Sequence, residues 1–100
     1  MVKHVILWQL KDGLSEAEQQ KIKADIKAGL EGLKGIVPGL LEIKVNINGL
    51  ETSNCDVMLD STLESVEALK GYAVHPDHVA VATNLVKPFV KQRICFDYEV

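Results

Sequence analysis

The chain is poor in cysteine and proline, and it has no excess of positive charge. Of its 100 residues 2 are cysteines and 3 are prolines, and the formal net charge at pH 7 is −3. Two cysteines make no disulfide framework and lack metal-ligand spacing, so we expect Cys55 and Cys95 to be reduced core residues of a cytoplasmic protein. An acidic balance argues against nucleic acid as a partner, because phosphate binding needs a concentrated basic surface.

Long apolar runs are also absent. No stretch approaches the roughly 20 residues that span a bilayer, and no block of like charge predicts a helix on a membrane surface. The apolar start at residues 1–10 is short and interrupted, and no small-residue cleavage site follows, so we expect no signal peptide. The hydrophobic content of 47% is ample for the core of a single domain over residues 1–100 and for an interface besides.

The first half of the chain predicts a strand, a helix and a second strand. Both alternate faces of residues 2–10 are largely apolar, which indicates a buried strand. Ser15 and Glu18 make a capping-box pattern that opens a helix, which Gly35 and Pro38-Gly39 end. Its apolar stripe consists of Ile22, Ile26, Leu30 and Leu33. A half-buried strand follows, with alternating apolar residues Leu41, Ile43, Val45 and Ile47.

The second half predicts a strand, a helical region and a last strand. Residues 55–60 read as a strand, and residues 61–64 as the start of a helix that continues through Val66, Leu69 and Tyr72. Pro76 is well placed in the first turn of a further helix, which Pro88 ends. The inner stripe of that helix is Val79, Ala82, Val86 and Phe89. Residues 93–98 alternate as the last strand.

This order of elements is typical of one fold class. Strand, helix, strand, strand, helix, strand is the ferredoxin-like βαββαβ arrangement, an α+β protomer with an antiparallel four-stranded sheet. Helices then cover one face of the sheet, while the other face keeps Val5, Leu7 and alternating apolar residues of the remaining strands. Because an uncovered apolar sheet face usually marks an interface, we expect a homodimer.

A cluster of proton-exchanging side chains surrounds Pro76. Two of the 3 histidines and one of the 2 tyrosines, namely Tyr72, His75 and His78, occur together there. In the first helical turn the helix dipole keeps the His78 ring neutral, as a general base requires. A turn can bring the Tyr72 phenol to the same cavity, whereas His75 before the proline is expected to cap or orient the turn. A purely structural role for each side chain is the alternative.

Metal and thiol chemistry are weaker hypotheses. His4, His75, Asp77 and His78 are potential ligands, but the His-x-x-His spacing lacks a secure third ligand, so we expect no metal and no cofactor. His4 lies on an otherwise apolar strand face and is expected to be a core histidine with a hydrogen-bond partner. We expect the two cysteines to lie in strand cores, away from a base.

Segments along nearly the whole chain carry a family resemblance. They are Lys3–Leu7, Pro38-Gly39, Asn46, Leu63–Leu69, Tyr72–Val79 and Arg93–Glu99. The most specific of them is the pattern Tyr-x-x-His-Pro-x-His. With these segments the chain resembles the stress-responsive dimeric α/β-barrel proteins, called Dabb. The resemblance implies a ferredoxin-like protomer whose open sheet pairs face to face with that of a second copy, which forms a barrel with helices outside.

The resemblance also implies a site. Most of the family has no assigned activity, but the branch similar to olivetolic acid cyclase closes linear polyketides by intramolecular aldol condensation. In that branch a histidine is the base and a tyrosine assists, roles that the motif places on His78 and Tyr72. The substrate-binding positions that it implies match His4, Ile6, Ile22, Ile26 and Leu59, and His75 of the motif is added to them.

Two functions remain as hypotheses. The first is a cofactor-free enzyme with a hydrophobic pocket, in which a His base and a Tyr act on an enolisable, polyketide-like carbonyl substrate. The second is a non-catalytic, stress-responsive structural or ligand-binding dimer. Space distinguishes them, because a cavity reached by His78 and Tyr72 favours the first function and a filled interior favours the second.

Overall fold

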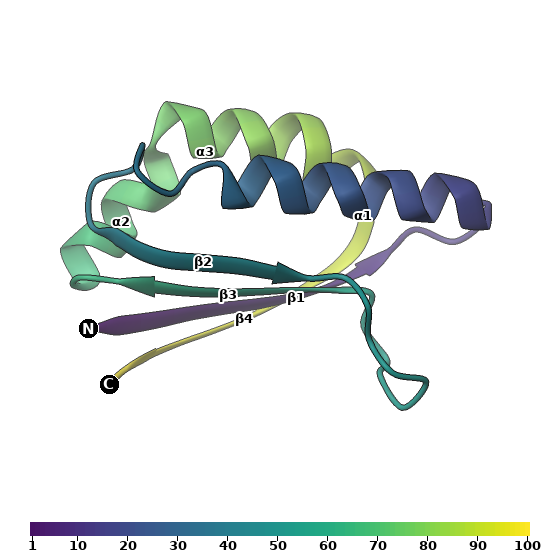
Figure 1. The fold of residues 1–100 in the computed structure, drawn as a ribbon, viewed down its shortest axis with the longest axis horizontal. Coiled ribbons are helices and arrows are strands. Elements are labelled where there is room, and N and C mark those ends of the chain that lie inside the picture. The colour runs from purple at the N-terminus through teal and green to yellow at the C-terminus, as the bar shows by residue number, and fades with distance from the viewer.

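Four antiparallel strands form one sheet, and all the helices lie on one of its faces (Figure 1). The computed structural model describes residues 1–100. The strands β1 (Val2–Leu10), β2 (Leu40–Asn46), β3 (Val57–Leu63) and β4 (Val90–Glu99) lie in the order β2-β3-β1-β4. The predicted α+β ferredoxin-like protomer is therefore confirmed.

Three helices join the strands. They are α1 (Glu16–Glu31), α2 (Val66–Val74) and α3 (Pro76–Val81). The chain stays helical after α3, through a π-helical turn η1 (Ala82–Val86) and a 3-10 turn η2 (Lys87–Phe89). Pro88 therefore does not end the helical region, because η2 accommodates it near its own start. No helix has both the length and the apolar character needed to cross a membrane.

Capping residues explain where α1 begins and why it ends early. The Ser15 side chain accepts from the Glu18 backbone N–H, and the Glu18 carboxylate accepts from the Ser15 N–H, so the predicted capping box is confirmed. The helix ends at Glu31 with Gly32 as its cap, four positions before the predicted Gly35. Gly35 instead has a positive φ of 84°, in the turns that lead to β2.

The predicted start of the second helical region was wrong. Residues 61–63 belong to β3, where Ser61 pairs with β1 on one side and with β2 on the other. The helix cap is Ser65, whose hydroxyl accepts from the Ala68 N–H at 3.1 Å. β3 also begins at Val57, so Cys55 lies before the strand rather than in it.

The inner face of the sheet, which the helices cover, holds the core. β1 contributes every second residue to it, from Val2 to Leu10, all of them buried. Ile22, Ile26 and Leu30 of α1 pack into the same core. On β2 a bulge between Leu40 and Glu42 places Leu40 inward and leaves Leu41 exposed, which corrects the predicted alternation from Leu41.

The opposite side of the sheet, here the open face, is apolar on one half only. Cross-strand partners place Val5 and Leu7 of β1 beside Phe96 and Ile94 of β4 on this face, with Tyr98 further along. Phe96 has 68% of its surface exposed. β2 presents Glu42, Lys44 and Asn46 there, so the expectation of apolar residues on all the remaining strands was wrong. Its apolar residues face the helices instead.

Both cysteines are free thiols that lie outside the core. Cys55 is half-buried in the loop before β3, and Cys95 is exposed on the inner face of β4. The expectation of two core cysteines was wrong, because β4 is an edge strand whose inner face is only partly covered.

Candidate active site

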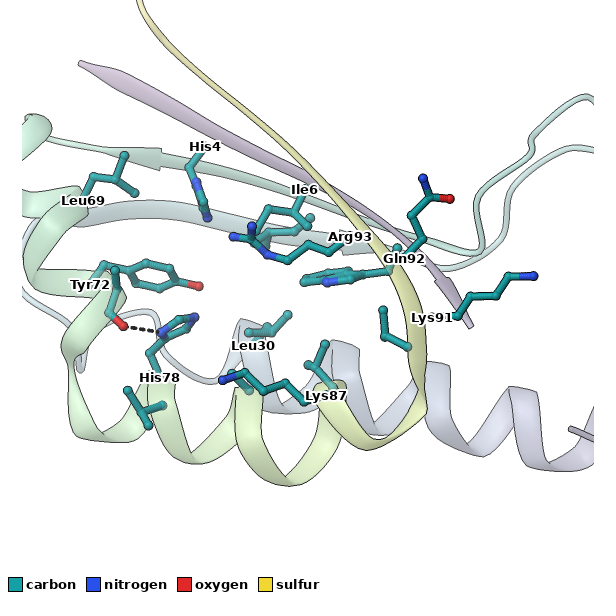
Figure 2. Close-up of a pocket in the computed structure, with 17 residues that line it drawn as sticks. His4, Ile6, Leu30, Leu69, Tyr72, His78, Lys87, Lys91, Gln92 and Arg93 are labelled. Carbon is teal, nitrogen blue, oxygen red and sulfur yellow. Dashed lines mark hydrogen bonds between the residues drawn. The ribbon is translucent and has the colours of Figure 1, made fainter. Parts of the chain in front are cut away.

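A cavity of about 490 Å³ lies between the sheet and the helices on the β4 side. Its walls come from strands β1, β3 and β4, from α2, α3, η1 and η2, and from the end of α1 (Figure 2). They are mostly apolar, and the polar side chains that reach in include His4, Tyr72, His78 and Arg93. The volume is within the roughly 300–1,000 Å³ of small-molecule sites. The interior is therefore not filled, which is the feature that favours a ligand-binding site.

The start of α3 positions His78. Pro76 occupies the first turn, and the side chain of His75 accepts from the Asp77 N–H at 3.1 Å. The ring nitrogen Nδ1 of His78 lies 3.3 Å from the carbonyl oxygen of Ala73, in the preceding helix (Figure 2). A carbonyl only accepts, so Nδ1 carries the proton in the neutral ring. The lone pair of Nε2 is then left for a ligand.

The surroundings of His78 favour its neutral form. Burial lowers the pKa of the imidazole below its usual value of 6.5, and the positive charge of Arg93 acts in the same direction. The hydrogen bond to Ala73 opposes the shift but does not reverse it. His78 is thus an uncharged imidazole at neutral pH, as a general base must be.

Tyr72 lies at the end of α2, beside His78. Its ring is 1% exposed, and the centroids of the two rings are 4.2 Å apart. Its hydroxyl is buried and has no hydrogen-bond partner in the protein. Figure 2 shows the hydroxyl pointing into the cavity. Burial raises the pKa of Tyr72 to about 12, so the phenol stays protonated and is a hydrogen-bond donor that lacks an acceptor.

His4 approaches Tyr72 from the sheet. Its ring is edge-on to the Tyr72 ring at a centroid distance of 5.8 Å, and it points into the cavity (Figure 2). Its Nδ1 is hydrogen-bonded to the carboxylate of Asp97, the residue opposite it on β4. This bond fixes the ring and directs the other nitrogen away from Asp97. The expectation that His4 has a hydrogen-bond partner is confirmed.

The structure brings together five of the eight site residues predicted from the sequence. His4, Ile6, Leu59, Tyr72 and His78 all line the cavity. Ile22 and Ile26 do not, because α1 packs them into the core and reaches the cavity only with Leu30. His75 also lies outside it, where it caps α3.

Arg93 and Asp97 are the site residues that sequence reasoning missed. Both alternate with Ile94, Phe96 and Tyr98 along β4, so they lie on the inner face opposite Trp8 and His4. Alternation alone does not tell which set faces inward. The charge of Arg93 and Asp97 favours the wrong orientation, because charged side chains are unusual on a sheet face that helices cover, so the sequence held no signal for their place.

One group of side chains has atoms close enough to share a metal ion. The potential ligand atoms of His4, Cys95 and Asp97 lie within 4.8 Å of one another. This group differs from the ligands weighed from the sequence, in which His75 already accepts a backbone hydrogen bond. A metal ion here would compete with the hydrogen bond between His4 and Asp97.

Fold and site define a small ferredoxin-like α+β domain with a histidine- and tyrosine-lined cavity. Residues 2–100 match the model of the Stress responsive A/B Barrel Domain, and the chain belongs to that family, Dabb. The resemblance seen in the sequence is thus confirmed.

Similarity to individual proteins supports this assignment. The chain is 28% identical to olivetolic acid cyclase of Cannabis sativa over 97% of its own length and 94% of that protein. A dimeric protein of unknown function from Bacteroides fragilis, also 28% identical, superposes with a TM-score of 0.92 over 99% of this chain and 95% of the other. Hydroxynitrile lyase from Passiflora edulis shares the fold at 20% identity, with a TM-score of 0.71 and coverages of 97% and 90%.

Proposed function

We propose that the protein is a cofactor-free enzyme that removes a proton from the carbon beside a carbonyl group of an apolar, polyketide-like substrate. The observation that carries the proposal is the buried Tyr72 hydroxyl, which has no partner and points into a cavity beside a neutral imidazole. A buried donor without an acceptor costs free energy, which a substrate oxygen would recover. The likeness to olivetolic acid cyclase supports the same chemistry.

Each side chain has a defined part in the proposed step. Nε2 of His78 takes the proton from carbon, and the electron pair of the broken C–H bond moves onto the carbonyl oxygen. The Tyr72 hydroxyl donates a hydrogen bond to this oxygen and stabilises the enolate. The enolate carbon then attacks a second carbonyl group of the same substrate molecule, and His78 returns its proton to the alkoxide that forms. His4, held by Asp97, contributes a second polar contact on the sheet side.

A cyclisation assay tests this function. The probe is a linear alkyl β-triketone, whose intramolecular aldol closure with loss of water gives an aromatic ring that absorbs in the ultraviolet. The wild type should accelerate closure, and His78→Ala should lose about 10²–10⁴-fold of that rate. The matched control is Val74→Ala, a neighbouring truncation at a side chain that is 75% exposed and outside the cavity. It should keep the rate.

The alternative function is distinguished in the same experiment. If the wild type binds the triketone but closes it no faster than the reaction proceeds without protein, the protein is a binding protein without this chemistry. A His78→Ala variant that unfolds would assign the histidine to structure.

We further propose that two copies of the chain pair through the open face. The open face carries an apolar surface that no helix of the same chain covers, made of Val5, Leu7, Ile94, Phe96 and Tyr98. The Lys3 ammonium on this face is paired with Asp60 at 2.6 Å and bonded to Thr62 at 3.0 Å. Burial would therefore leave this lysine with its partners, which lowers the cost of an interface. Dimeric relatives of the same fold support the proposal. A stable wild-type monomer in light scattering would refute it.

A further inference from the structure

The cavity is positively charged although the protein is acidic. Its lining includes Lys87, Lys91 and Arg93 but no aspartate or glutamate. The whole chain has 14 acidic and 11 basic residues, so this separation does not follow from composition. The carboxylate of Asp97, outside the lining, is hydrogen-bonded to His4 of the cavity wall. A concave surface lined by one sign of charge concentrates ligands of the opposite sign.

Arg93 is the cation that can serve a ligand inside the cavity. Figure 2 shows its side chain extending across the cavity toward His4, whereas Lys91 points away. Lys91 is also already paired with Asp12 at 2.9 Å. Arg93 forms no ion pair, and it is the only arginine in the chain. Its charge adds to the effect of burial in lowering the pKa of His78 and acts against the larger effect of burial that raises the pKa of Tyr72, so Arg93 lies within electrostatic reach of both side chains.

The inner face of β4 explains why the guanidinium is held there. Arg93 lies opposite Trp8 in the β1–β4 ladder, on the side that faces the helices. Arg93 is exposed and forms no ion pair, so its guanidinium is accessible to an anionic group that enters the cavity. Its planar fork matches the two oxygens of a carboxylate in a bidentate arrangement.

The remaining walls define the rest of the ligand. The helical side of the cavity is apolar and is lined by Leu30, Leu69, Val79, Ala82 and Val86. A ligand with one anionic end and an apolar chain therefore matches both parts of the lining. We propose that the cavity binds a small carboxylic acid with an apolar chain, with its carboxylate on Arg93 and its chain against these helical residues.

This inference rests on the proposed function and deepens it, because it names the substrate class as an enolisable oxo acid. A carboxylate on Arg93 anchors the ligand at the sheet, and its carbon chain then crosses the space that the side chains of Tyr72 and His78 face. The anchor also disfavours protonation of the acid itself in the site, because a neighbouring cation stabilises the ionised form.

A binding experiment needs no turnover. Trp8 is the only tryptophan and lines the cavity, so its fluorescence reports on occupancy. The probes are octanoate and its uncharged methyl ester, titrated against the wild type. Octanoate should bind about tenfold or more tightly than the ester, since hydrogen bonds between charged groups are stronger than those to a neutral ester. Equal affinity of the two probes would overturn the proposal without any variant.

Variants assign the preference to one side chain. Arg93→Gln should lose the preference for octanoate and keep the affinity for the ester, and Arg93→Lys should retain part of the preference. The charge-matched control is Lys70→Gln, which removes an exposed cation of α2 outside the cavity and should change neither affinity. Loss of the preference in Lys87→Gln with Arg93→Gln unaffected would overturn the assignment to Arg93.

Failure of the anion site and failure of the chemistry are separable. Octanoate binding and cyclisation are measured separately on the wild type and on Arg93→Gln, because the binding of octanoate requires no proton transfer. If octanoate binding depends on Arg93 while no variant or wild type accelerates cyclisation, the acid-binding site stands and the proposed enzyme activity fails. If the wild type accelerates cyclisation but shows no preference for octanoate over its ester, the enzyme activity stands and the acid-binding site fails.

Discussion

The two edge strands of the sheet carry opposite patterns. On β2 the inner face is apolar, with Leu40, Ile43 and Val45, and the open face is polar, with Glu42, Lys44 and Asn46. On β4 the inner face is polar, with Arg93, Cys95 and Asp97, and the open face is apolar, with Ile94, Phe96 and Tyr98. The rule that apolar residues face the helices therefore holds for β2 and fails for β4.

The cause lies in what each edge meets. α1 packs on β2, and two of its side chains bond the backbone of Val45: Glu31 accepts from the N–H at 2.9 Å, and Lys27 donates to the carbonyl at 2.7 Å. The hydrogen bond from Lys27 holds the pKa of Glu31 below its usual value. On the β4 side a cavity separates sheet and helices. The polar pattern of β4 thus belongs to the cavity, and its apolar pattern to the open face, through which we propose that two copies pair.

The largest effect should come from a charge on the inner face of β2. Val45 is fully buried, so Val45→Asp should lower the free energy of unfolding by more than about 4 kcal/mol and prevent stable folding. Lys44→Asp, one residue away on the exposed side of the same strand, should change it by less than about 1 kcal/mol. Urea denaturation followed by circular dichroism measures both. A folded Val45→Asp protein would contradict the packing described for β2.

A charge on the open face of β4 should break assembly rather than folding. Phe96→Lys should raise the dimer dissociation constant by about 10²–10⁴-fold, because a buried unpaired charge costs several kcal/mol. The control is Asn46→Lys on the polar open face of β2, which should leave the dimer intact. Sedimentation velocity reads out both variants. An unchanged dimer in Phe96→Lys would place the interface elsewhere.

Loss of the Tyr72 hydroxyl should separate stability from activity. Because this hydroxyl has no partner in the protein, Tyr72→Phe should leave the free energy of unfolding within about 1 kcal/mol of the wild type, or raise it. The same variant should lose about 1–3 kcal/mol of transition-state stabilisation in the cyclisation assay. A strong loss of stability in thermal unfolding would mean that the hydroxyl has an internal partner.

The pH dependence should follow the direction of the two pKa shifts. The pKa of His78 is lowered by burial, so cyclisation should fall off on the acid side with an apparent pKa below 6.5. Tyr72, with a pKa of about 12, should cause no loss between neutral pH and about pH 10. A rate profile across this range checks both limbs. An acid limb centred above the usual histidine value would contradict a neutral base.

Stability should show a smaller effect with the same origin. Because the folded state resists protonation of His78, the unfolded state binds more protons below about pH 6.5, and stability falls as the pH decreases through that value. The loss should be smaller in His78→Ala. Urea unfolding of both proteins at about pH 8 and pH 5 measures the difference.

The comparison of the two edges also shows how far the sequence could predict the molecule. Strand and helix order, the Ser15 capping box and Pro76 at a helix start have local causes, and local patterns revealed them. The β2 bulge at Leu40 has no local cause, because a one-residue shift of register depends on the partner strand. Ser61 was misread for a related reason, since its short polar side chain is typical of helix caps but here bonds the His4 carbonyl from within β3.

The candidate site was predictable where its residues are neighbours in the chain. Tyr72 and His78 share one motif, and a turn brings their rings together. Asp97 and Arg93 lie more than 80 positions from β1, and their place depends on which side of β4 faces the helices. The alternation fits both orientations. Ile22 and Ile26 were assigned by resemblance alone, and the packing of α1 directs them into the core.

The proposed base must be a neutral imidazole in the cavity on the β4 side, and an NMR titration of the histidine side chains measures its charge without a substrate. His78 is assigned by comparison with His78→Ala. We predict an apparent His78 pKa below 6.5 and a neutral ring protonated on Nδ1, which bonds the Ala73 carbonyl. An apparent pKa well above 6.5 would identify a charged, structural histidine and contradict the proposed base.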